Sequence, residues 1–346
     1  MQPPTARPEP TVLQRFSLQY CSLRRLVLVA ITALAAALGL VAAAPAFAAY
    51  PERPIRLIVP FPAGGTVDYV ARQYAAQLGR ILGGNVVTEN VPGAGGTIAT
   101  TRVAKAAADG HTVLFTTPNH TINPALYQNL PFDTARDLVP VSLLAQIPEL
   151  LVAHASQPYQ DFAGMVAYAR ANPDKLNYSS AGNGTLPHVT MELLLQQLGI
   201  RVTHIPYKGA APAMNDLLAG QVGLKMDTIA TSTPHIKTGR LKPLAIASLA
   251  RSPLMPDVPT VAELGVPGYQ GILWMGVLVP RDTPEAIVDQ LHAASAKAMA
   301  DPELRGKFGG DGVEILATTP VAFGELIKTE LAQWADVVRR SKITAE

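Results

Sequence analysis

The chain has 346 residues, of which 48% are hydrophobic and only 16% charged, and its formal net charge is +2. Residues 1–49 hold four of the 28 basic residues and one of the 26 acidic ones, so the net charge of the remainder is close to −1. This balance excludes the basic footprint of a nucleic-acid-binding protein or of a protein that binds anionic membranes.

Residues 1–49 have the pattern of a cleavable export signal. Arg15, Arg24 and Arg25 precede the apolar run 26–44, and Ala46-Phe-Ala48 provides the small residues of a cleavage site. We therefore predict cleavage near Ala48-Ala49. The single cysteine, Cys21, lies before the apolar run, so the mature chain has none. Thiol catalysis, disulfide bonds and cysteine metal sites are thereby excluded.

The rest of the chain alternates short β-branched runs with segments of helical periodicity, beginning with a strand at 55–59 and a helix from Val67. This alternation predicts an α/β protein with mostly parallel sheets and helices on both faces. The length favours two domains. Further strands are expected at 85–90, 111–117, 176–180, 202–205, 221–226 and 244–248, and C-terminal helices at 284–300, 302–308 and 320–340.

A turn rich in Pro and Gly, Phe61–Thr66, joins the first strand to the first helix. A strand that turns over paired glycines into a helix leaves backbone N–H groups and the positive helix end facing outward. Such a turn is a small anion site made of backbone alone. Asp68, in the first helical turn, can satisfy those N–H groups itself. This turn alone therefore does not decide whether a ligand binds there. We expect Asp68 to shape the loop.

The same pattern recurs in the second half of the chain. The strand at 176–180 leads into the turn Ala181–Thr185 and then into a helix. The hydroxyl groups of Ser180 and Thr185 add polar atoms to a second backbone anion site. Ligands of parallel α/β sheets bind at the carboxyl ends of the strands, so we expect the two turns to face one cleft.

Other polar residues also follow predicted strands. Asn119 and His120 come after 111–117, and a histidine in such a loop is more often a surface residue than a ligand contact. Lys208 and Gly209 come after 202–205, and Asp227 ends the strand at 221–226. These side chains are weaker candidates for ligand contacts than the two turns.

Two extended apolar segments are candidates for crossings between domains. Val139–His154 is too long for one ordinary strand and contains Pro148, which predicts a break. Tyr269–Val279 contains Trp274 and would provide the return crossing. We expect a hinge where these segments pass between the domains, near 145–150 and 271–275.

A nucleotide-binding site and a hydrolase site are the two alternatives to this interpretation. The glycines at 93–96 lack the spacing of a dinucleotide fingerprint, and no Walker-type Lys-Ser/Thr is present. A hydrolase is an alternative, with Ser179 or Ser180 as nucleophile, although no G-x-S-x-G motif surrounds either serine. Its histidine would be His188 or His204 and its acid Asp227.

Several motifs, in this order, resemble the periplasmic solute-binding proteins of tripartite tricarboxylate transporters, the Bug family. Ala63 departs from the proline that is usual in that family, and Lys225 stands in a strand where an apolar residue is usual. The motifs are Pro60–Asp68, Glu89–Gly96, Asp109–Thr112, Asn177–Thr185, His204–Gly209, Pro259–Glu263 and Trp274–Gly276.

The resemblance implies a two-lobed periplasmic-binding-protein (Venus flytrap) fold with two inter-lobe crossings. Lobe 1 would comprise 50–147 and 275–346, and lobe 2 would comprise 148–274. The implied function is non-catalytic and needs no cofactor or metal: a periplasmic monomer captures a small carboxylate in the inter-lobe cleft. It then delivers the carboxylate to integral membrane transporter subunits or, alternatively, presents it to a membrane sensor kinase. Expected ligand contacts are Phe61, Pro62, Ala63, Gly64, Gly65, Thr66, Asp68, Asn119, His120, Ser180, Gly182, Asn183, Gly184, Thr185, Lys208, Gly209, Asp227 and Trp274.

Overall fold

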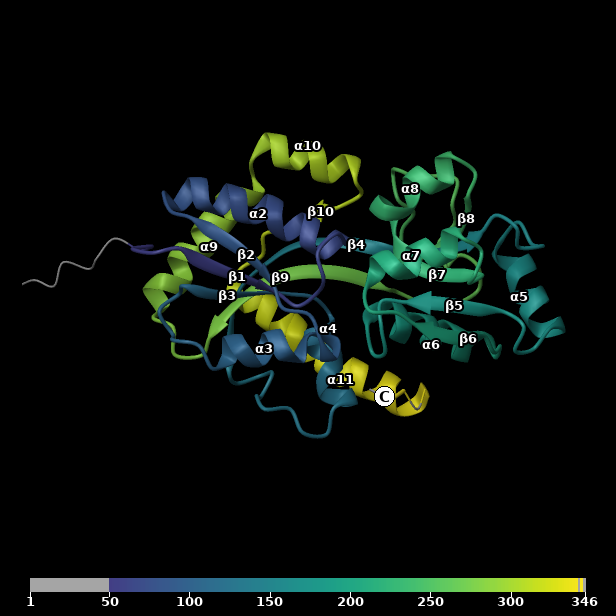
Figure 1. Ribbon diagram of the computed structural model, residues 1–346, viewed down its shortest axis with the longest axis horizontal. Helices are drawn as coiled ribbons and strands as arrows, with labels where there is room; N and C mark the ends of the chain where they lie inside the picture. The colour runs from purple at the N-terminus through teal and green to yellow at the C-terminus, as the bar shows by residue number, and fades with distance from the viewer. Residues whose placement is uncertain (1–49, 342, 345–346) are drawn as a thin grey trace, which may run out of the picture. The chain divides into compact units, whose positions relative to one another are not determined.

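The computed structural model describes residues 50–341 and 343–344. The predicted signal segment, residues 1–49, lies outside the described residues. The described residues form one compact unit, a mixed sheet with helices against it in two lobes (Figure 1). Among the described residues, no helix is both long and apolar enough to span a membrane.

The first lobe is built on β1 (Ile55–Val59), which lies between β2 (Val86–Asn90) and β3 (Thr112–Thr116) and runs parallel to both. β1 is almost wholly buried because it is a β-branched run with helices on both sides. The helices of this part are α2 (Thr66–Leu82), α3 (Thr97–Ala104) and α4 (Asn119–Leu126), preceded by the short η1 (Ala94–Gly96). In α2 the buried positions Val70, Ala71, Tyr74, Ala75 and Leu78 follow the predicted helical spacing.

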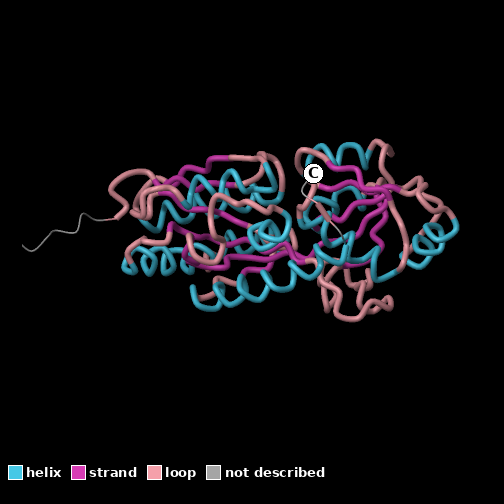
Figure 2. Tube along the Cα trace, turned by 90° about the horizontal axis from the view of Figure 1, so that it is seen from below, coloured by secondary structure: helices cyan, strands magenta, loops and turns pink. Residues whose placement is uncertain are grey.

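The second lobe repeats this arrangement around β5 (Asn177–Ser180). β5 lies between β6 (Thr203–Pro206) and β7 (Leu224–Thr228) and is parallel to both. Its own hydrophobic core gathers residues from the strands and from the helices on either side. Figure 2 shows helices on both sides of the strands. The helices are α5 (Phe162–Ala171), α6 (Leu186–Leu198), α7 (Ala210–Leu218) and α8 (Ile229–Lys237).

Two long strands, β4 (Leu138–His154) and β9 (Ile272–Pro280), connect the lobes and pair antiparallel with each other. The sheet order is β2-β1-β3-β9-β4-β7-β5-β6, with β8 (Leu241–Ile246) and β10 (Glu314–Ile315) also on β4. The parallel pairs expected from the alternation are those around β1 and β5, whereas the pairs of β4 and β9 are antiparallel.

The break expected at Pro148 is wrong, because β4 runs unbroken through it. On one edge of β4, β10 pairs with Ala145 and Gln146, and β7 begins to pair at Glu149. Pro148 falls between these two partner strands, so its missing N–H removes no hydrogen bond from that edge.

The C-terminal helices are α9 (Glu285–Met299), α10 (Pro302–Gly310) and α11 (Pro320–Ser341). α11 packs against α4 of the first lobe and α6 of the second, where Trp334 and Val337 join a buried cluster with Ile122 and Val189. This helix therefore contacts both lobes outside the two crossing strands.

Candidate functional site

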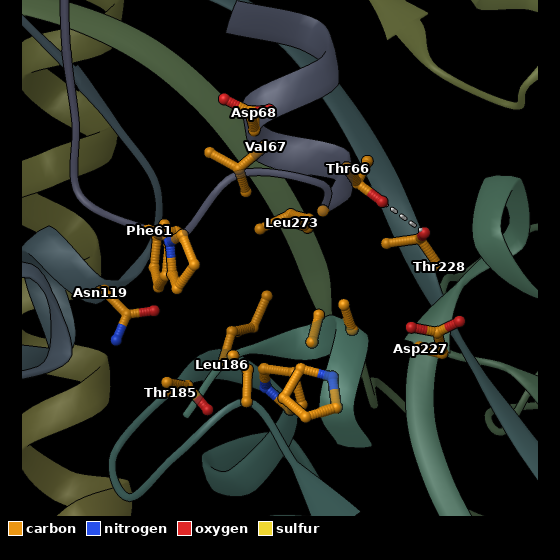
Figure 3. A pocket seen from close by; sticks show the side chains of 18 of the residues that line it. Phe61, Thr66, Val67, Asp68, Asn119, Thr185, Leu186, Asp227, Thr228 and Leu273 are labelled. Carbon is orange, nitrogen blue, oxygen red and sulfur yellow. Dashed lines mark hydrogen bonds between the residues drawn. The ribbon is translucent and has the colours of Figure 1, made fainter. Parts of the chain in front are cut away.

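A cavity of about 110 Å³ lies between the two lobes (Figure 3). Since an apolar cavity of roughly 150 Å³ accommodates benzene, this one suits a ligand with a short carbon skeleton. Most of its lining is apolar, from residues such as Val67, Leu186 and Leu273. The lining comprises Phe61–Ala63, Gly65–Asp68, Asn119, Glu149, Ala181, Thr185–Pro187, Gly209–Pro212, Lys225, Asp227, Thr228 and Leu273.

Four helices begin at this cavity. Their N-cap residues all line it: Gly65 for α2, Thr185 for α6, Gly209 for α7 and Thr228 for α8. None of the four helices has a side-chain cap hydrogen bond. Their first N–H groups lack intrahelical partners, and four positive helix ends converge on one space. This arrangement favours an anion held by backbone donors.

The first turn is held in shape by Asp68. Its carboxylate accepts hydrogen bonds from Gly64 N at 3.1 Å and from Asn90 Nδ2 at 2.8 Å, and it pairs with Arg72. Burial alone would raise the pKa of Asp68, but the hydrogen bonds from Arg72, Asn90 and Gly64 hold that pKa below its usual value. The expectation that Asp68 shapes the loop agrees with these contacts.

The second turn is held in shape by two histidines. His188 Nδ1 accepts a 2.9 Å hydrogen bond from Gly184 N, and His204 Nε2 lies 2.6 Å from Ser180 Oγ. The same Ser180 Oγ accepts from Gly182 N at 3.1 Å. The two imidazole rings stack with their centroids 3.9 Å apart. Burial lowers the pKa of His188 to about 3, with the neighbouring His204 adding to this, and burial lowers the pKa of His204 to about 4.

The lowered pKa values of His188 and His204 predict that the stability of the fold decreases in mild acid. Both rings are neutral in the folded protein, whereas in the unfolded chain a histidine binds a proton below pH 6.5. The free energy of unfolding should therefore decrease as the pH is lowered from about 6.5 to about 4, by at most about 1.4 kcal/mol per pH unit for His188. Urea unfolding at pH 7.0 and 5.5 measures this. A His188→Gln variant should lose part of the pH dependence, and an unchanged dependence would contradict the prediction; His235→Gln, on α8, is the control.

The two lobes touch each other directly at the cavity. Thr66 Oγ1 of α2 and Thr228 Oγ1 of the second lobe are 3.0 Å apart in a buried hydrogen bond, drawn as a dashed line in Figure 3. Asn119 Nδ2 donates to Gly184 O at 3.2 Å. The structure therefore has the two turns in the closed arrangement, with both lobes contacting across the cavity.

Three ionisable side chains line the cavity at the connecting strands and β7. Glu149 of β4, Lys225 and Asp227 are 2%, 1% and 5% exposed, respectively. Lys225 Nζ forms an ion pair with Asp227 Oδ1 and also donates to Met226 O at 3.3 Å. In the described part of the chain, no group of three or more His, Cys, Asp or Glu side chains could hold a metal ion.

The structure brings ten of the residues predicted as ligand contacts into the cavity lining, and it places the other eight elsewhere. Gly182, Asn183 and Lys208 line an adjoining groove, where Phe61 and Gly209 also contribute. Gly64, Ser180 and Gly184 lie in or beside the two turns but not in the cavity lining. The ten that line the cavity are Phe61, Pro62, Ala63, Gly65, Thr66, Asp68, Asn119, Thr185, Gly209 and Asp227.

His120 and Trp274 lie away from the cavity lining. His120 is 2% exposed in the first turn of α4, where sequence analysis expected a loop, and neither of its ring nitrogens has a hydrogen-bond partner among the described residues. Trp274 packs against Phe323 and donates from Nε1 to Glu330 at 2.8 Å. Its neighbour Leu273 lines the cavity instead, because successive side chains of a strand point to opposite faces.

Sequence reasoning missed the apolar walls and one buried carboxylate. Leu186, Pro187, Ala211 and Pro212 follow the N-caps of α6 and α7, so the helix starts that were recognised could have indicated them. Glu149 is an isolated acidic residue within an apolar run, and that interruption was a signal in the sequence.

Comparisons with known proteins find one family model and several similar chains and structures. Residues 70–343 match the family model described as the tripartite tricarboxylate transporter family receptor. The protein BugT of Bordetella pertussis is 35% identical over 294 residues, which cover 84% of this chain and 90% of BugT. Two solved structures of Rhodopseudomonas palustris proteins are also similar. One, with adipate, has 35% identity, covers 85% of this chain and 99% of its own, and gives a TM-score of 0.81. The other, MatC with bound malate, has 37% identity, covers 84% and 100%, and gives a TM-score of 0.79.

Proposed function

Because the chain belongs to the tripartite tricarboxylate transporter receptor family, we propose that it is a periplasmic solute-binding protein that captures a small carboxylate in the cavity between its lobes. It delivers this carboxylate to the integral membrane subunits of a transporter. The proposed carboxylate contacts are the backbone N–H groups that follow Gly65, Thr185, Gly209 and Thr228 at the starts of four helices.

The convergence of these four uncapped helix starts carries the proposal. A hydrogen bond to a charged group contributes about 1.5–3 kcal/mol, so several backbone donors hold a carboxylate without a buried arginine. The apolar walls exclude water and thereby strengthen these bonds. The adipate and malate held by similar structures are ligands of the same chemical class.

We propose that the lobes close by bending where β4 and β9 pass between them. Lobe 1 then comprises 50–147 and 275–346, and lobe 2 comprises 148–274. The hinge region includes Glu149 N, which donates to Gly271 O at 2.8 Å. The contact between Thr66 and Thr228 joins the two lobes, so opening breaks it and must also rearrange the packing of α11 on α4 or α6.

The geometry favours a binding protein over a serine hydrolase. Ser180 Oγ does lie 2.6 Å from His204 Nε2, as a nucleophile and base would. However, Ser180 is fully buried and is absent from the cavity lining, and its hydroxyl group also bonds to the Gly182 backbone. Asp227, the acid of the hydrolase alternative, pairs with Lys225 instead. We infer that the serine and histidine support the turn.

A thermal-shift screen of carboxylates tests the proposed function. A ligand at 100 times its Kd should stabilise the fold by ~2.7 kcal/mol, which corresponds to a rise in Tm of roughly 5–10 °C for a protein of this size. Short mono- and dicarboxylates and amino acids form the panel, with neutral sugars of similar size as the control. The proposal is wrong if a neutral sugar raises the Tm and no carboxylate does.

A further inference from the structure

Glu149 is buried at the cavity, and one of its carboxylate oxygens is left without a partner. The residue lies in the middle of β4, lines the cavity and is 2% exposed. Its Oε2 lies 2.6 Å from Thr190 Oγ1 of α6, whose single hydroxyl proton is shared with Leu186 O at 2.7 Å. No residue in the described part of the chain donates to Oε1. Oε1 is not fully buried but keeps access to the cavity, so a donor group of the ligand can reach it.

Glu149 also differs from the other carboxylates of the lining in its charge balance. Asp68 is paired with Arg72, and Asp227 is paired with Lys225. The remaining oxygen of Asp227 accepts hydrogen bonds from Thr231 and Ser232. Glu149 has no cation within ion-pair distance among the described residues. When it is ionised, this part of the cavity lining carries one uncompensated negative charge.

We propose that the ligand carries a protonated amine in addition to its carboxylate, and that Glu149 binds this amine. The four helix starts would hold the carboxylate. Oε1 of Glu149 would accept a hydrogen bond from the ammonium group on the side of the cavity formed by β4. The inference rests on the proposed function, because it assigns the second end of the same ligand. A ligand with a second carboxylate would instead place a like charge beside Glu149 and Asp227.

The pKa of Glu149 gives this inference a pH signature. Burial raises the pKa of Glu149 to about 7, with Asp227 adding to the rise, while Thr190 and Lys225 oppose it. Tyr269, whose phenol donates to Thr190 O, is the other ionisable group nearby, and its own raised pKa keeps it neutral. An ammonium ion stabilises the ionised carboxylate, so binding releases a proton. The Kd should fall about tenfold per pH unit from pH 5 to 7 and then level off.

Titration calorimetry at pH 6 and pH 8 with three matched series tests the proposal. The series are amino carboxylates from glycine to 5-aminopentanoate with the α-amino acids of equal carbon number, dicarboxylates from malonate to adipate, and monocarboxylates from acetate to pentanoate. We expect one amino carboxylate to bind at least tenfold more tightly than any member of the other two series, and more tightly at pH 8. If a dicarboxylate or monocarboxylate binds best, the inference is overturned while the proposed function stands. If nothing in any series binds, both fail.

Glu149→Gln supplies the matched variant, since it keeps an acceptor for Thr190 but removes the charge. It should weaken the amino carboxylate at least tenfold and abolish the pH dependence, but should not weaken monocarboxylates. Glu192→Gln, on the same helix as Thr190, is the control, because Glu192 accepts from the Tyr178 hydroxyl and does not line the cavity. A folded Glu149→Gln protein that retains the preference for the amine overturns the inference. If this variant does not fold, the wild-type series and pH profile decide it.

Discussion

A Thr66→Cys/Thr228→Cys variant, once oxidised, is expected to bind ligand roughly 100-fold more slowly than the wild type, because the disulfide holds the lobes together. The two hydroxyl oxygens are 3.0 Å apart across the cavity, so sulfurs at these positions come within reach of a disulfide. Residues 50–346 contain no other cysteine, and no competing pair can form. Stopped-flow measurement of the association rate, with and without a reducing agent, gives the result.

The order of addition provides an internal control for this variant. Ligand added before oxidation should be trapped, so its dissociation rate should fall as strongly as the association rate does. Either single cysteine variant should behave like the wild type in both conditions. An oxidised double variant that binds at the wild-type rate would show that ligand reaches the cavity without separation of the lobes.

Gly209→Ala is expected to reduce ligand affinity at least tenfold. Gly209 is the N-cap of α7 and has φ +121° and ψ 169°, a conformation essentially restricted to glycine, which costs another residue about 1–3 kcal/mol. Its Cβ would also lie 3.3 Å from Pro62 Cγ of the opposite lobe. We expect the backbone to relieve this strain by moving the start of α7 away from the cavity. Because about 1.4 kcal/mol corresponds to a tenfold change in Kd, a strain of this size accounts for the expected loss of affinity.

Gly199→Ala is the matched control for Gly209→Ala. Gly199 ends α6 with φ +62°, and nothing lies within 4 Å of a Cβ added there. This control should lower the Tm but leave the Kd unchanged, since its strain lies far from the cavity lining. Calorimetric Kd values for both variants decide the matter. Equal losses of affinity, or none at Gly209, would contradict the role given to α7.

Local pattern was enough to predict the two turns that face the cavity. Phe61–Thr66 and Ala181–Thr185 each follow a short predicted strand and precede a helical periodicity, and both signals are local in the sequence. The structure places Gly65 and Thr185, from these turns, at helix starts in the cavity lining. Whether these atoms contact the ligand stays a prediction.

Long-range geometry explains what sequence analysis could not supply. Sequence analysis predicts Trp274 as a ligand contact, whereas Leu273 lines the cavity. The face of a strand that points to the cavity depends on its register with β4 and not on residue type, so the sequence alone does not distinguish the two. The start of α8 at Thr228 joins the site only because β7 pairs with β4 beside Glu149. The cavity lining combines residues from both lobes, and their proximity depends on pairing between strands that are distant in the sequence, so only the fold reveals it.

The most direct test is a crystal structure of the protein with a carboxylate that raises its Tm. The account predicts that the ligand carboxylate lies between the two turns, within hydrogen-bond distance of the backbone N–H groups that follow Gly65 and Thr185, with the lobes in contact at Thr66 and Thr228. A ligand bound in another groove, or a carboxylate held only by side chains, would contradict it.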